Sequence, residues 1–77
     1  MTKPEHPGNV LWRMMREHGW NQEQLAAAAG VRASTVQDIL GWNRPITLYL
    51  AVKLGHAFGT SAERWLTLQR AWEDGQP

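Results

Sequence analysis

Hydrophobic residues along this chain recur every three or four positions, which is the period of an α-helix. In the first such segment Val10, Leu11, Met14, Met15 and His18 form one stripe. No alternating strand pattern, internal repeat or low-complexity tract interrupts the series. We therefore expect an all-α fold of five helices. Their predicted ranges are 7–18, 22–29, 33–40, 48–58 and 60–73.

Capping residues mark where these helices begin. Asn21 with Gln24 predicts a capping box, and Thr47 is a suitable cap for the fourth helix. Thr60 with Glu63 predicts a second capping box at the start of the last helix. Glycines close the first four helices: Gly19, Gly30, Gly41 and Gly59.

The chain has 77 residues, enough for a single domain. We expect a flexible arm over 1–6, the domain over 7–74 and a frayed tail over 75–77. The absence of cysteine excludes disulfides and fits a reducing compartment. The first twenty residues hold no sustained hydrophobic run, so we expect no signal peptide or membrane segment and a cytoplasmic protein.

The segment from Gln22 to Leu40 carries the strongest functional signal. Two short helices meet at Gly30, and the alanines before it allow the second helix to approach closely. Val31 is suited to fill the gap between the helices. Val36 and Ile39 lie on one face of the second helix, and the opposite face is polar. This layout is typical of a helix-turn-helix, whose second helix enters the major groove of DNA.

Each outward residue of this unit has an expected role. Gln22 positions the protein on a phosphate, and Arg44 grips phosphates from the following loop. Gln37 is suited to bond adenine with two hydrogen bonds, and Ala33 or Thr35 to touch a thymine methyl group. The full expected DNA-binding set is Gln22, Arg32, Ala33, Ser34, Thr35, Gln37, Asp38, Asn43 and Arg44.

The net charge alone neither supports nor excludes DNA binding. The net charge is only +1, from eight basic and seven acidic residues. Phosphate contacts then depend on how the basic residues gather locally. Asp38 counts against a DNA-facing surface, since phosphates repel a carboxylate unless it accepts from a cytosine amino group. Periodicity alone leaves open a helical bundle whose polar face is merely solvated.

Specific motifs favour one family. The runs 21–26 (Asn-Gln-Glu-Gln-Leu-Ala), 30–31 (Gly-Val) and 34–36 (Ser-Thr-Val) resemble the phage-repressor-like, or lambda-repressor-like, helix-turn-helix family. Further motifs together resemble HigA-type antitoxins. They are His6-Pro7-Gly8, Arg44-Pro45-Ile46-Thr47, Gly59-Thr60-Ser61, Trp65-Leu66 and Leu68-Gln69. The resemblance covers His6 to Glu73, nearly the whole chain.

This resemblance implies a five-helix domain that binds operator DNA as a homodimer. It also implies a gene beside that of a HigB-type ribonuclease toxin, which the protein would neutralise by binding while repressing their shared operon. Two alternatives stay open. One is a stand-alone helix-turn-helix repressor with no toxin. The other is a protein-interaction or engineered assembly module on which the DNA face is silent.

The sequence departs from the HigA pattern at or near the expected DNA face. Gly41-Trp42-Asn43 stands where the family has Asn-Gly-Lys, and Arg32 replaces a capping serine. Position 38, often basic or polar, is Asp38. Leu48-Tyr49-Leu50 replaces a segment that usually begins with proline. These changes mark a diverged or engineered member, and they affect operator preference.

Five tryptophans are many for a chain of this length. Trp65, Leu68 and Trp72 lie three and four residues apart on the last helix, a spacing that suits core packing or a dimer interface. Both roles are compatible if Trp65 points inward and Trp72 lies between subunits. Trp12 is expected to pair with Arg16 in a cation–π contact or to touch a partner protein.

Trp42, in the loop after the third helix, packs either on the DNA backbone edge or over the core. The three histidines lie on separate elements without ligand spacing, so we expect no metal and no cofactor. No nucleophile is paired with a base, and no carboxylate pair has an acid–base arrangement. We therefore expect that the protein is not an enzyme.

Overall fold

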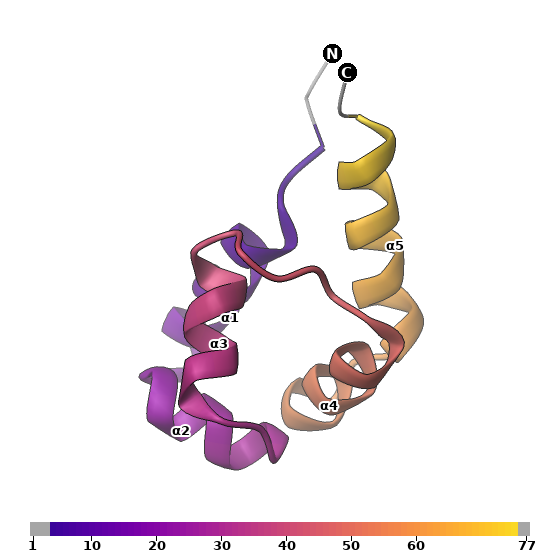
Figure 1. Cartoon of the computed structure of the whole chain (residues 1–77). Helices are drawn as coiled ribbons and strands as arrows, with labels where there is room; N and C mark the ends of the chain where they lie inside the picture. The colour runs from indigo at the N-terminus through magenta and orange to yellow at the C-terminus, as the bar shows by residue number, and fades with distance from the viewer. Residues whose placement is uncertain (1–3, 76–77) are drawn as a thin grey trace.

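The computed structural model describes residues 4–75, and within this range the chain folds into five α-helices. They are α1 (Pro7–His18), α2 (Gln22–Ala29), α3 (Ala33–Leu40), α4 (Leu48–Phe58) and α5 (Ala62–Asp74). Figure 1 shows α1, α2 and α3 grouped on one side and α4 with α5 on the other. The described residues contain no strand, so the all-α prediction is confirmed.

Most helix ends follow the predicted chemistry. The side chain of Asn21 accepts from the backbone N–H of Gln24 at 2.8 Å, and the Gln24 side chain accepts from the N–H of Asn21 at 2.8 Å. The predicted capping box is confirmed. The glycines after α1, α2 and α4 all adopt the left-handed conformation that their lack of a side chain permits: Gly19, Gly30 and Gly59.

The start of α5 differs from the prediction. Ser61, not Thr60, is the N-cap, and its hydroxyl accepts from the N–H of Arg64 at 3.2 Å. The hydroxyl of Thr60 instead accepts from the indole N–H of Trp65 at 3.1 Å. The sequence predicted that the hydroxyl oxygen of Thr60 caps α5. In the structure this oxygen instead makes a tertiary contact with the buried ring of Trp65.

One hydrophobic core holds all five helices together. α4 packs against α5, α2 contacts both α3 and α4, and α1 contacts α3 and α5. Trp65 is the largest completely buried side chain. The other core residues come from α1 to α4 and from the loop before α4: Val10, Leu11, Met15, Leu25, Ala26, Ala29, Val36, Ile39, Ile46, Leu50, Ala51 and Leu54.

The residues just before α1 are packed, where a flexible arm was expected. The carboxylate of Glu5 makes two 2.8 Å hydrogen bonds with the guanidinium of Arg13. His6 is buried, and its Nδ1 accepts from the N–H of Gly8 at 2.9 Å. Burial lowers the pKa of His6, which favours the neutral ring that this hydrogen bond requires. Residues 1–3 of the expected arm and 76–77 of the expected tail lie outside the described residues.

The ring of His6 connects three distant parts of the chain. It stacks on Trp42, with ring centroids 4.4 Å apart and planes 10° from parallel. Trp72 of α5 meets both rings edge-on, at 4.9 Å from His6 and 5.1 Å from Trp42. The indole N–H of Trp42 donates to Asn9 of α1 at 3.2 Å. The loop between α3 and α4 is thereby fastened to α1 and α5.

Trp42 also terminates α3 in an unexpected way. Gly41 has ordinary right-handed angles, with φ −86°, and Trp42 has the positive φ of 65° instead. A side chain rarely adopts this conformation without compensation. The stack on His6 and the hydrogen bond to Asn9 supply that compensation here. No helix among residues 4–75 is long and apolar enough to cross a membrane.

Candidate nucleic-acid interface

The α2–turn–α3 unit has the geometry of a helix-turn-helix. Gly30 turns the chain with φ 73°, and its N–H donates to the carbonyl of Ala26 at 2.8 Å. Val31 donates to the same carbonyl at 3.0 Å and packs half-buried against the core. α3 buries Val36 and Ile39, so that its other face is left at the surface. The predicted turn at Gly30 and the predicted exposed face of α3 are therefore both present.

One shallow groove separates the start of α2 from α3 and has a volume of about 610 Å³. Gln22 lies on one side, and Ser34 and Gln37 on the other, all three exposed. Half-buried Ala33 also lines this groove. Four of the sequence-predicted DNA-binding residues therefore share one surface. An amide, a hydroxyl and a second amide offer hydrogen bonds there without a competing partner in the described chain.

A second groove, of about 390 Å³, lies between α3 and the start of α4. It brings together Arg32, Thr35 and Arg44 from the predicted set. Arg32 is the N-cap of α3 but makes no capping hydrogen bond with its side chain, which is exposed. Two guanidinium groups therefore border the same hollow, which supplies the local positive charge that the net charge does not show.

Sequence reasoning missed two residues of this second groove, Thr47 and Tyr49. Thr47 was assigned only as a cap, and its hydroxyl does accept from the N–H of Leu50 at 3.3 Å. Tyr49 had no predicted role and was named only in the segment Leu48-Tyr49-Leu50, which departs from the HigA pattern. The available signal was its position at the start of a helix that follows the loop predicted to contact DNA.

Asp38 and Arg44 form an ion pair at the edge of this interface. The carboxylate oxygen of Asp38 accepts from the guanidinium of Arg44 at 3.1 Å, and both side chains are about half exposed, at 42% and 47%. The backbone carbonyl of Asp38 also accepts from the N–H of Asn43 at 2.8 Å. Asn43 is exposed but lines neither groove. The negative charge of Asp38, which would otherwise repel phosphates, is thus paired with the positive charge of Arg44.

Replacing Asp38 by Asn tests this pairing. We expect Asp38→Asn to strengthen DNA binding at low salt, because the repulsive carboxylate is lost and Arg44 is released toward a phosphate. The slope of log affinity against log salt should steepen by roughly 1. Fluorescence anisotropy over a salt series measures both quantities. In an Arg44→Ala background the steeper slope should vanish; a slope that steepens equally there would contradict the pairing.

The expected dimer residues on α5 are largely used inside the subunit. Trp65 has no exposed surface and cannot contact a second chain, so its inward placement is confirmed and its interface role is not. Leu68 is half-buried against the core. Trp72 is half-buried and packs on His6 and Trp42.

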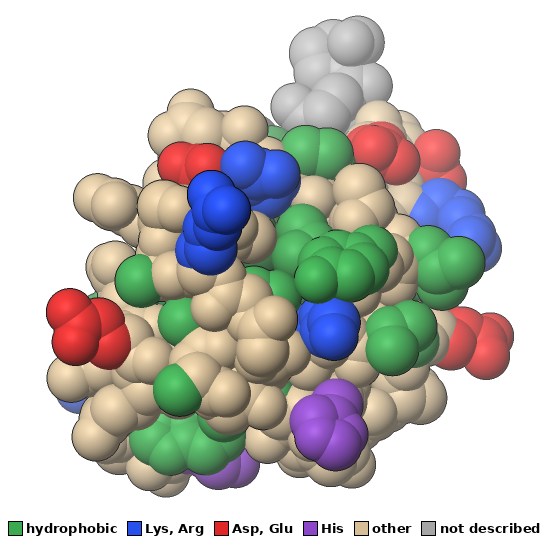
Figure 2. All heavy atoms as spheres, turned by 60° about the horizontal axis from the view of Figure 1, so that its bottom comes forward, with side chains coloured by type: hydrophobic (Ala, Val, Ile, Leu, Met, Phe, Trp, Pro, Cys, Tyr) green, Lys and Arg blue, Asp and Glu red, His purple; other side chains and the backbone are tan. Residues whose placement is uncertain are grey.

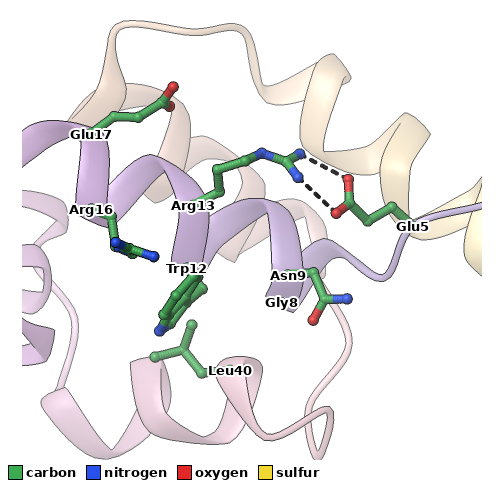
Figure 3. Close-up of a pocket in the computed structure, with 8 residues that line it drawn as sticks. All are labelled: Glu5, Gly8, Asn9, Trp12, Arg13, Arg16, Glu17 and Leu40. Atoms are coloured by element: carbon green, nitrogen blue, oxygen red, sulfur yellow. Dashed lines mark hydrogen bonds and ion pairs between the residues drawn. The ribbon is translucent and has the colours of Figure 1, made fainter.

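A third groove runs along α1 and is drawn in Figure 3. Trp12 lies there 52% exposed, with the guanidinium of Arg16 at 4.7 Å from its ring, so the expected cation–π pair is present. Leu40 of α3 lies beside the indole. Trp42 packs within the domain, on His6 and Trp72, while 49% of its surface stays exposed.

Comparison with known proteins agrees with this geometry. The sequence model of the HTH_3 helix-turn-helix family matches residues 12–65. The chain is 29% identical over 72 residues to YddM of Escherichia coli K12, an uncharacterised HTH-type transcriptional regulator. That match covers 94% of this chain and 77% of YddM.

Two solved structures are similar over almost the whole chain. PA4674 of Pseudomonas aeruginosa, in complex with 18 bp of its operator DNA, superposes with a TM-score of 0.89 at 36% identity, covering 97% of this chain and 82% of that one. An addiction module antidote protein of a HigA family from Coxiella burnetii gives 0.86 at 33% identity, covering 96% and 82%. These are regulators and antitoxins, not enzymes. The chain belongs to the phage-repressor-like helix-turn-helix family, and within it to the HigA type.

Proposed function

We propose that this protein binds a palindromic operator as a cytoplasmic homodimer and represses the operon that encodes it together with a HigB-type ribonuclease toxin. It neutralises the toxin by binding it. One observation carries the DNA-binding part: the polar face of α3 stands exposed between two grooves, one lined by Gln22 and the other by Arg32 and Arg44. This surface offers base-reading amides between groups suited to phosphates.

The division of roles follows from position. Ser34 and Gln37 extend from the exposed side of α3, which in this fold enters the major groove. Gln37 can pair with an adenine edge through both amide atoms. Gln22, Arg32 and Arg44 lie on either side of α3 and meet the two flanking backbones. Two copies on a palindrome place their recognition helices about 34 Å apart, in successive major grooves.

Two variants separate base reading from phosphate contact. Gln37→Ala should reduce discrimination at one base pair by roughly 1–3 kcal/mol and leave the salt slope unchanged. Arg44→Ala should weaken binding to all sequences alike, because it leaves the Asp38 carboxylate unpaired near the phosphates. In the Asp38→Asn background, where Arg44 is no longer paired, it should also reduce the salt slope by about 1. Gel shifts on the promoter region upstream of the gene, with single-base operator variants, measure both. If the two variants exchange these effects, the role assignment is wrong.

The toxin part of the proposal is supported by family type, since the HigA-family relative from Coxiella burnetii is an addiction module antidote. Its test is co-expression with the neighbouring reading frame. We expect that frame to encode a small ribonuclease whose expression stops growth, and co-expression of this chain to restore it. Growth arrest that persists, with both proteins soluble, would refute neutralisation.

A stand-alone repressor is the second candidate, favoured by the similarity to YddM, an HTH-type transcriptional regulator. Both candidates use the same DNA interface. A gene neighbourhood without a ribonuclease frame, together with repression of the chain's own promoter, would decide for the stand-alone repressor.

A further inference from the structure

One histidine of this chain makes a contact that only an uncharged ring permits. His6, the N-cap of α1, is 5% exposed, and its Nδ1 accepts from the N–H of Gly8 at 2.9 Å. An imidazolium carries a hydrogen on both nitrogens and has no atom left to accept with. A positive charge here would also lie at the positive end of the α1 dipole. His18 and His56 differ in being exposed, and Figure 2 shows histidine side chains at the molecular surface.

The ring of His6 also supports the loop between α3 and α4. It stacks on Trp42 at 4.4 Å, and Trp72 meets it edge-on at 4.9 Å. Trp42 has a positive φ of 65°, a conformation that persists only while surrounding contacts enforce it. Asn43 and Arg44 follow directly in the chain. Loss of the stack therefore removes a contact that enforces this conformation and allows the backbone of the loop to relax.

We propose that His6 is a positioning residue for this loop and that a proton on its Nδ1 releases the loop, so that DNA binding weakens in mild acid. The protonated ring loses its hydrogen bond to Gly8 and leaves the stack, and Trp42 then returns to ordinary backbone angles. The effect on DNA rests on the proposed function, in which Arg44 contacts a phosphate. The release of the loop does not depend on that function.

The direction of the effect follows from the proton balance. Burial lowers the pKa of His6 below its ordinary value of 6.5. The hydrogen bond from Gly8 acts in the same direction, whereas a cation–π contact with Trp42 would oppose both. The loop in place therefore binds fewer protons than the released loop. Above pH 6.5 the ring is uncharged in both states; below it, the equilibrium constant for release rises by up to about tenfold per pH unit.

Other ionisable groups on the elements around His6 do not account for this response. They are Glu5 before α1, Arg13 on α1, Asp38 and Arg44 on α3 and its loop, and Arg70, Glu73 and Asp74 on α5. Carboxylates titrate mostly below about pH 5, and arginines keep their charge. The hydrogen bonds from Arg13 lower the pKa of Glu5 still further. Between about pH 5 and 7 the proton therefore binds at a histidine, and His6 is the buried one.

The test follows the full chain without DNA by NMR between about pH 5 and 7.5. It records the ring signals of His6, the indole N–H of Trp42 and the backbone amide of Arg44. We expect all three to shift with one midpoint, which lies below 6.5. His6→Asn is the test variant, because asparagine caps a helix well and takes up no proton here. His56→Asn, at an exposed position of α4, is the matched control.

His6→Asn lacks the ring, so at pH 7.5 its Trp42 and Arg44 signals should already resemble those of acidified wild type and should not titrate. His56→Asn should titrate like wild type. The inference is overturned if the ring of His6 titrates without a shift at Trp42 and Arg44, if its midpoint is 6.5 or higher, or if His6→Asn keeps the wild-type shifts. Should His6→Asn fail to fold, the three midpoints of wild type still decide.

DNA binding is measured separately by fluorescence anisotropy on promoter DNA at constant ionic strength. Wild type and His56→Asn should lose up to about tenfold in affinity between pH 6.5 and 5.5. His6→Asn should bind weakly throughout and show no such loss. Coupled NMR shifts without promoter binding at any pH would refute the proposed function but not the release of the loop. The same pH profile in wild type and His6→Asn would overturn the inference and leave the proposed function standing.

Discussion

Trp65→Ala should destabilise the domain by about 3–5 kcal/mol, the usual cost of removing a large aromatic side chain from a core. Trp65 is completely buried, packs with Phe58 at a ring distance of 6.1 Å and donates to Thr60 at 3.1 Å. Its loss leaves a cavity where α5 meets the rest of the core. Since small domains have only about 5–15 kcal/mol of stability, we expect much of the variant to be unfolded at room temperature.

Urea unfolding followed by far-ultraviolet circular dichroism measures this loss. Trp12→Ala is the control, because Trp12 is 52% exposed and its removal costs one exposed cation–π contact. We expect its unfolding free energy to fall by no more than about 1 kcal/mol. Equal losses for the two tryptophans would contradict the described core.

Gly55→Ala should destabilise the domain by about 1–3 kcal/mol, although alanine normally strengthens a helix by about 1 kcal/mol relative to glycine. The added Cβ would lie 2.6 Å from the carbonyl oxygen of Thr60 and 3.3 Å from the nitrogen of Ala62. Both are backbone atoms and cannot rotate away. The substitution therefore forces α4 and α5 apart, where two core helices pack.

Thermal and urea unfolding of Gly55→Ala give the sign of the effect directly. His56→Ala, at the exposed next position of α4, controls for a general change in helix propensity and should alter stability by about 0.5 kcal/mol or less. A variant at least as stable as wild type would show that α4 does not approach the start of α5 as closely as described.

Local chemistry made most helix ends predictable. The Asn21–Gln24 capping box and the turn at Gly30 depend on residues a few positions apart, so the sequence alone defines them. The start of α5 was not predictable in the same way. Thr60 and Ser61 both offer a hydroxyl there, and only the packing of Trp65 against Thr60 decides which one caps the helix.

The candidate site was predictable to a similar extent. Helical periodicity placed Ser34 and Gln37 on the exposed side of α3, where they lie. The ion pair between Asp38 and Arg44 was not foreseen, because it spans a loop whose path depends on Trp42. A positive φ at Trp42 follows from its contacts with His6 and Asn9, which are far away in sequence.

The stack of His6, Trp42 and Trp72 has a consequence for the energetics of recognition. It fixes the loop that carries Asn43 and Arg44 before any DNA arrives. The conformational entropy of this loop is therefore lost during folding and not during association, so the phosphate contacts proposed for the loop keep more of their free energy as affinity. The net charge of this short domain is small, so its long-range electrostatic attraction to DNA is weak. A loop that is already rigid compensates for this by lowering the entropy lost on binding.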